Sequence, residues 1–351
     1  MLGRREFFTV FLWRLILLAG IGYLLWRLTS LIVIVLLSVI LYYCLAPFIK
    51  WLCRRKFWRK TTMNTRRLIS AILVILAFLL VTIASVYFLV SPLVSEARDL
   101  QVNITLYTKV LIKFAENIQQ KFLRLPPQFQ KVITDQLTQL SEQARRAIAF
   151  IMEKTVSAIG KIWEVFLIPI IAFYLAIGAK GLRRELFLFI PRKYTREALM
   201  ILNAMDKAMR QYIVGQFIAC LILWITVWGV LTLMGIDFPL FLGVIAGATR
   251  AIPIIGPIIG GAPVVLLGLV KSPLWGLYSF LFFSFLQFID AKIILPLFIG
   301  HQMRLHPVSI IIAIFIGGEF FGILGMFMAT PIAAAIKSLF QIYYTHGAKS
   351  R

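Results

Sequence analysis

Long uninterrupted apolar runs dominate this sequence, and they decide the solvent in which the chain can fold. Hydrophobic residues make up 61% of the 351 residues, and charged residues only 15%. Soluble domains are about half apolar and a quarter charged. A spanning helix needs about 20 apolar residues, because each residue rises ~1.5 Å through a hydrocarbon core about 30 Å thick. The sequence therefore predicts an all-α polytopic membrane protein with about eight hydrophobic segments.

The apolar runs divide the chain into five parts. The runs cover about 9–28, 30–49, 68–91, 156–178, 212–236, 239–270, 273–299 and 307–342. We expect N-terminal membrane helices (1–92), an insert (93–153), a fourth helix with a basic segment (154–210), a C-terminal membrane domain (211–342) and a tail (343–351). The first run is expected to remain as a span, because no small-residue cleavage site precedes the next one. The third run is expected to end at Ser91-Pro92.

The net charge of +23 lies mainly in the connections between apolar runs. Residues 50–67 carry many basic side chains and no acid, and residues 180–210 form a second, more diluted basic segment. Such segments stay in the cytoplasm. This pattern predicts a multi-pass inner-membrane protein with both termini cytoplasmic, and Lys271 inside if all eight runs span. It argues against nucleic acid as a partner, because the basic residues lie where cytoplasmic loops of membrane proteins carry them.

Residues 93–153 differ from the rest in having mixed charges and helical periodicity. Pro126-Pro127 separates two amphipathic stripes, which predict an insert of two helices. The insert follows three spans, so we expect it outside the membrane on the extracytoplasmic side. A packing or oligomerisation element is the expected role, and a substrate-capturing lid is the alternative.

The sixth and eighth runs correspond at an offset of 68 residues, which aligns Pro239 with Pro307 and Pro263 with Pro331. Their helix-breaking residues are Pro253, Gly256, Pro257, Pro263, Gly317, Gly318, Gly322, Gly325 and Pro331. A broken helix leaves unpaired backbone groups, so it persists only inside protein or beside a wet cavity. Paired broken segments indicate a transporter's binding site. Close helix packing is the alternative, and the breaks permit either a span or a re-entrant hairpin.

Ionisable residues lie inside these apolar runs. Arg250 and Glu319 occur at the two breaks, and Asp290 lies in the seventh run, one helical turn after Gln287. A charge at the bilayer centre costs roughly 2.5–3.5 kcal/mol, so such groups are normally paired or face water. Either carboxylate could be the partner of Arg250. A transport site and a charge pair that fixes helix register both remain open.

A family resemblance rests on the residues from Ala251 to Pro257, which are similar to the Ile-Pro-x-x-Gly-Pro signature of the autoinducer-2 exporter (AI-2E) family. Further matching positions are Gln216, Gln287, Asp290, Pro296, Gly300, His306, Pro307, Gly317, Gly318, Gly322, Gly325 and Pro331. The resemblance covers the whole chain in layout, while its specific motifs lie within about 210–340. Arg250 departs from the pattern, because a neutral residue is expected there.

The resemblance implies a bacterial permease that exports the signal autoinducer-2 as a homo-oligomer, with elevator-like movement. It also implies cation/proton antiport as an alternative, because some members are described as sodium or lithium ion antiporters. The lipid bilayer and a small polar solute, or a monovalent cation and a proton, are then the expected partners. No cofactor is expected.

The leading hypothesis is therefore a secondary transporter that exports a small polar solute such as autoinducer-2, with Asp290 or Glu319 coupling transport to protons. The alternatives are a sodium or lithium ion/proton antiporter and a non-transporting membrane scaffold. An enzyme is not expected. The sequence has no His-Glu metal motif, no Gly-x-Ser-x-Gly and no phosphate-binding loop. Its three histidines are too dispersed to predict a metal site.

Overall fold

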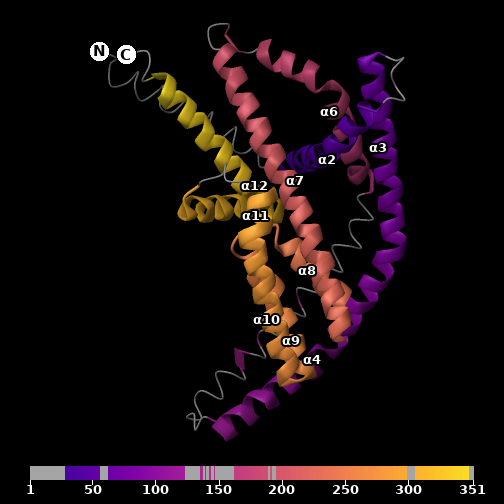
Figure 1. Ribbon diagram of the computed structural model, residues 1–351, viewed down its shortest axis with the longest axis vertical. Coiled ribbons are helices and arrows are strands. Elements are labelled where there is room, and N and C mark those ends of the chain that lie inside the picture. Colours follow the sequence, from indigo (N-terminus) through magenta and orange to yellow (C-terminus); the bar gives the residue numbers. More distant parts are fainter. Residues whose placement is uncertain are drawn as a thin grey trace, which may run out of the picture. The chain divides into compact units, whose positions relative to one another are not determined.

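The computed structural model describes residues 28–55, 62–122, 162–188, 190–191, 195–298 and 305–347, with a few positions between 135 and 146. Within these ranges every regular element is helical (Figure 1). The elements are α2 (Thr29–Cys53), α3 (Met63–Ser85), η2 (Val86–Val90), α4 (Ser91–Phe122), α6 (Ile162–Leu188), α7 (Thr195–Met234), α8 (Pro239–Thr249), α9 (Gly256–Lys271), α10 (Pro273–Ile289), η4 (Asp290–Ile294), α11 (Leu295–Phe298) and α12 (Pro307–Gly347).

The helices confirm an all-α polytopic membrane protein. In the described part of the chain, 5 helical stretches are long and apolar enough to cross a membrane, and shorter apolar helices occur beside them. The first apolar run falls outside the described residues up to residue 27, and the second insert helix does so almost entirely. The two broken runs, 239–270 and 307–342, are indeed broken.

The sequence predicted that the third apolar run ends at Ser91-Pro92. The helix that contains this run does not end there. α3 continues through the π-helical turn η2 into α4, so residues 63–122 follow one helical path. Proline removes a backbone donor, and its ring crowds the carbonyl four residues earlier. A π turn is wider than an α turn. The π turn immediately before Pro92 therefore relieves the crowding and lets the helix continue.

The chain forms two compact units. The first comprises Met1–Leu68, Trp163–Met205 and Leu305–Arg351, and the second comprises Ile69–Ile162 and Asp206–Arg304. In the first unit, α2 packs on α12. In the second unit, α8 packs on α9, α9 packs on α10, and α4 contacts both α8 and α9.

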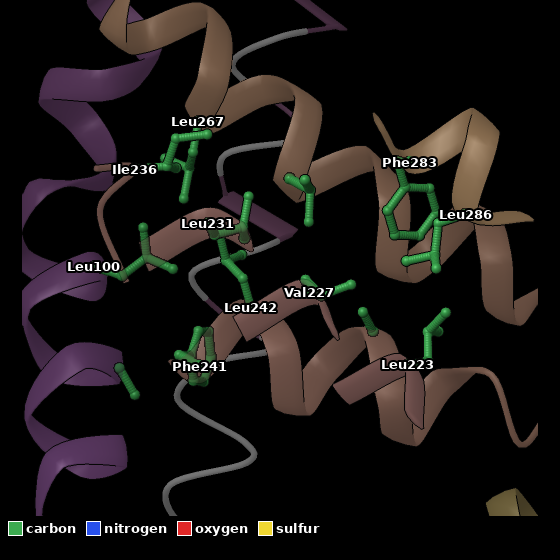
Figure 2. Packing of buried hydrophobic residues seen from close by; sticks show 13 residues of the cluster. Leu100, Leu223, Val227, Leu231, Ile236, Phe241, Leu242, Leu267, Phe283 and Leu286 are labelled. Atoms are coloured by element: carbon green, nitrogen blue, oxygen red, sulfur yellow. The ribbon is translucent and has the colours of Figure 1, made fainter. Parts of the chain in front are cut away.

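Apolar side chains from five helices, α4, α7, α8, α9 and α10, fill the centre of the second unit. Figure 2 shows Leu100 of α4, Val227 of α7, Leu242 of α8 and Phe283 of α10 within one cluster. Glycines allow these helices to approach closely. A methyl group at Gly247 of α8 would lie only 2.7 Å from the Trp224 side chain of α7. α8 is therefore held tightly against α7.

The sixth run folds as a helical hairpin. α8 has 11 residues and α9 has 16, so each is shorter than a spanning helix. The Lys271 ammonium at the end of α9 donates to the carbonyl oxygens of Met234 (2.7 Å) and Gly235 (2.8 Å) at the end of α7. The segment thus leaves α7 and returns to the same end of it.

The eighth run also reverses, within the first unit. α12 is interrupted at Gly322, whose φ of 58° and ψ of −141° are not helical. Residues 8 apart in one straight helix would lie about 12 Å apart. Here a methyl group added at Gly317 would overlap the carbonyl oxygen of Gly325. Two helical arms therefore fold back on each other across Gly322.

Candidate functional site: a buried ion pair at the hairpin tip

Arg250 occupies the tip of the α8–α9 hairpin. It follows the last residue of α8, and residues 250–255 form the turn between the two arms. Ile254 in this turn has a positive φ of 70°, a conformation that is strained for a β-branched residue. Gly256 then starts α9 against the Thr249 carbonyl, where a side chain would overlap backbone. The sequence correctly predicted a break in this segment.

The Arg250 side chain forms an ion pair with Asp290. Its Nε and Nη2 donate to Oδ1 of Asp290 at 3.0 and 2.7 Å. Arg250 is only 5% exposed and Asp290 7%. Of the two carboxylates considered as partners of Arg250, the structure pairs it with Asp290.

Asp290 begins the π-helical turn η4, where α10 changes its hydrogen-bond register. π turns within helices often mark functional sites. Asp290 and Ile294, at the two ends of this turn, are buried, while Lys292 between them is exposed. The lysine therefore does not join the buried cluster of Arg250 and Asp290.

Gln216 of α7 completes the cluster. Its Nε2 donates to the Arg250 carbonyl at 2.9 Å, and its Oε1 accepts from Arg250 Nη1 at 3.0 Å. Gln216 is 3% exposed. The amide therefore satisfies one free carbonyl of the turn and one guanidinium donor at the same time. Backbone breaks at membrane depth need such partners.

Two polar groups in or near this cluster remain unused. Among the described residues, only Oδ1 of Asp290 receives hydrogen bonds, which leaves Oδ2 without a donor. The Gln287 amide nitrogen, one turn earlier on α10, is buried and has no partner in the described part of the chain. Unpaired buried polar groups are uncommon in folded proteins. A hydroxyl or carbonyl compound, or a cation at Oδ2, could bind to these groups.

The second broken segment carries the other predicted site residues in the first unit. Gly317, Gly318 and Gly325 lie at the contact between the two arms of α12. Glu319 is exposed on this hairpin and has no ion-pair or hydrogen-bond partner among the described residues. Pro331 is buried inside the second arm.

The backbone supports the repeat seen in the sequence. Ile254 and Gly322, the two positive-φ positions of the breaks, are 68 residues apart. Thr249 and Gly317, also 68 apart, each present a carbonyl oxygen to a glycine that opens the returning arm. In the first hairpin Pro253 lies in the break, and Pro257 and Pro263 lie in α9.

Other residues that shape this region were not singled out from the sequence. Glu96 accepts a hydrogen bond from the Phe241 backbone nitrogen at 2.8 Å, and Tyr107 donates to Asp237 at 3.3 Å. These partners are more than 100 residues apart in the chain, and no local spacing reveals such pairs. No group of three or more potential metal ligands occurs in the described ranges.

Fold and site together define a polytopic α-helical membrane protein with a buried ion pair at the tip of a helical hairpin. Comparison with known families places it further. The AI-2E family transporter model matches residues 15–345. The chain therefore belongs to the AI-2E transporter family.

Relatives in several bacteria carry names of candidate transport proteins. YrrI of Bacillus subtilis (strain 168) is 30% identical over 205 residues, which are 57% of this chain and 58% of YrrI. YueF of the same strain is 30% identical over 176 residues, 50% of this chain and 48% of YueF. A protein of Thermotoga maritima is 24% identical over 308 residues, 87% of this chain and 86% of its own. The chain thus spans about half the length of the first two relatives, and family and relatives support a membrane transport role.

Proposed function

We propose that this protein is a secondary transporter that exports a small polar solute, such as autoinducer-2, and catalyses no reaction. The observation that carries the proposal is the buried Arg250–Asp290 pair at the hairpin tip, beside polar groups without partners. The two arms of 11 and 16 residues are about 16 and 24 Å long, so we expect the tip to reach into a hydrocarbon core about 30 Å thick. Membrane-embedded ionisable groups of this kind usually mark a substrate path.

The charge balance of the cluster favours an uncharged polar solute. Arg250 and Asp290 neutralise each other, and Gln216 and Gln287 add amide groups without charge. A neutral polyhydroxyl or carbonyl compound can accept from an amide or guanidinium and donate to Oδ2 of Asp290. Neither bond requires the ion pair to separate. Proton coupling would use Asp290, or Glu319 in the other hairpin.

We propose that the two hairpins enter the membrane from opposite sides. If the basic segment 180–210 is cytoplasmic, the far end of α7 and the mouth of the first hairpin lie outside. The stretch Pro273–Phe298 is long enough to cross once, which puts the start of α12 inside. Two of the eight predicted runs then re-enter, so six cross the bilayer and both termini stay cytoplasmic.

Cysteine labelling tests this topology. In a variant without Cys44, Cys53 and Cys220, we expect Leu274→Cys to react with an impermeant maleimide in intact cells. His306→Cys should react only after permeabilisation. Eight full crossings would give the inverse pattern at both positions, and that result would refute the re-entrant scheme.

A sodium or lithium ion/proton antiporter is the second candidate. The observation in its favour is that two carboxylates have oxygen atoms that accept no hydrogen bond among the described residues. These are Oδ2 of Asp290 and both oxygens of Glu319. In that mechanism a cation would bind a carboxylate directly and exchange with a proton. The ion pair with Arg250 argues against this mechanism, because it already neutralises the Asp290 carboxylate that would bind the cation.

A non-transporting scaffold receives less support. Its working surface would be the apolar face of the insert. In α4, however, part of that face is already buried within the chain, because Ala97 and Leu100 belong to the cluster with α7 and α8. The proposed bacterial inner-membrane location and homo-oligomeric assembly follow from the family resemblance and the basic segments.

Transport in proteoliposomes separates these functions. The purified protein is reconstituted with a pH-sensitive dye inside, and proton, sodium or lithium gradients are imposed. We expect no cation-driven proton exchange, and uptake of labelled autoinducer-2 in inverted vesicles that falls at least tenfold in Asp290→Asn. Asp206→Asn, which alters an exposed carboxylate, is the control and should transport normally. Cation-driven proton flux that is lost in Asp290→Asn or Glu319→Gln would instead establish the antiporter.

A further inference from the structure

The first helix of the hairpin has no N-terminal cap of its own. Its N-cap residue, Phe238, makes no capping side-chain hydrogen bond, and Pro239 follows at the first helical position. The first backbone N–H groups of a helix have no partners within it. Here the Glu96 carboxylate of α4 accepts from the Phe241 nitrogen at 2.8 Å across 145 residues of sequence. An acidic group at a helix N-terminus also stabilises the helix dipole.

A second contact holds the turn that precedes α8. The Tyr107 hydroxyl donates to Oδ2 of Asp237 at 3.3 Å, and its ring packs edge-on against Phe238 at 6.0 Å. A tyrosine hydroxyl is protonated at neutral pH, so it can donate this hydrogen bond. Phe238 has a positive φ of 59°, which is unfavourable for a phenylalanine. Such a conformation persists where its surroundings enforce it.

Glu96 and Tyr107 act from one face of α4. They are eleven residues apart, close to three helical turns. Between them Ala97 and Leu100 are buried, and Figure 2 shows Leu100 facing the cluster that contains Phe241. The two polar contacts therefore lie on either side of the apolar packing between α4 and the cluster. Through them α4 contacts both the turn before α8 and α8 itself.

We propose that α4 is the outer clamp of the transport hairpin, with Glu96 and Tyr107 as positioning residues for Arg250. This inference rests on the proposed function, because it gives the insert a role at the same site. The 11 residues of α8 form a rigid link of about 16 Å between the clamp and the tip. α8 is also wedged against α7 through its glycines. A shift at its N-terminus is therefore transmitted to Arg250, its C-terminal cap.

Hydrogen exchange of the purified full chain, followed by mass spectrometry, tests the clamp without reference to any solute. We expect Glu96→Ala to speed exchange in peptides covering 239–256 at least fivefold. Glu96→Gln keeps an acceptor for the Phe241 N–H and should recover most of the protection. Tyr107→Phe keeps the ring against Phe238 and should give a smaller increase. Asp99→Ala removes an exposed carboxylate from the same helix and should leave these peptides unchanged.

The same variants are then assayed for transport. The clamp predicts that Glu96→Ala lowers the rate at least threefold and that Glu96→Gln restores it. Unchanged exchange at 239–256 in Glu96→Ala would overturn the clamp, and so would a glutamine variant as defective as alanine. Faster exchange with unchanged transport would overturn the positioning role. If the wild type moves no solute, the proposed function fails, while exchange at residues 250–256 still decides whether α4 positions the tip.

Discussion

Removing the Asp290 carboxylate alone should destabilise the protein far more than removing the whole ion pair. Asp290→Leu leaves the Arg250 guanidinium buried without its counter-ion, and breaking a buried pair in this way costs about 3–5 kcal/mol. The double variant Arg250→Met/Asp290→Leu replaces both charges with apolar groups of similar size. We expect it to recover most of that loss. The remaining cost, about 1–3 kcal/mol, reflects the Gln216 oxygen left without a donor.

Thermal unfolding of the purified protein in detergent measures these differences. Asp206→Asn serves as the control, because its ion pair with Arg210 is 3.5 Å long and the two side chains are 28% and 44% exposed. An exposed pair contributes only about 0–1 kcal/mol. If the double variant lost as much stability as the single variants Asp290→Leu and Arg250→Met combined, Arg250 and Asp290 would not be coupled as described.

Glycine substitutions at the hairpin contacts should have effects opposite to those at open positions. An added methyl group at Gly256 would overlap the Thr249 carbonyl, which is backbone and cannot rotate away. Overpacking of this kind costs typically 1–3 kcal/mol. In Gly229 of α7 the same methyl group meets nothing within 4 Å. Alanine there should stabilise the helix by about 0.5–1 kcal/mol, because glycine is a poor helix former.

Measurements of the unfolding temperature and of the transport rate test the substitutions at Gly256 and Gly229. Gly256→Ala should lower both, and Gly229→Ala should lower neither. Gly325→Ala in the second hairpin should behave like Gly256→Ala, because its methyl group would overlap the Gly317 carbonyl. A Gly256→Ala variant as stable and active as the wild type would show that the arms need not pack this closely.

Local chemistry made the breaks predictable. Proline and glycine act within a few residues of their own position, so Pro253, Gly256 and Gly322 indicated where the two segments fail to continue as helices. The repeat at 68 residues followed from the prolines alone. The structure adds Ile254, which has a positive φ like Gly322 although its side chain gave no sign of it. A positive φ at a β-branched residue is set by the fold around it and cannot be predicted from propensity.

Long-range contacts were not predictable in the same way. Hydropathy gives the length of an apolar run but not the direction in which a broken one returns, so the return of Lys271 to the end of α7 could not be predicted. By charge alone, either Asp290 or Glu319 could have been the partner of Arg250. The choice of Asp290 depends on the packing of α9 against both α8 and α10. The tertiary cap from Glu96 to Phe241 had no local signal either.

The most direct test of the central claim is solute transport by the double variant Arg250→Met/Asp290→Leu, measured beside its unfolding temperature. The account predicts a folded protein, about 1–3 kcal/mol less stable than the wild type, that has lost at least nine-tenths of its transport rate. That combination separates a transport role of the ion pair from a purely structural one. Transport at the wild-type rate in this variant would contradict the account, because the charges at the hairpin tip would then be dispensable.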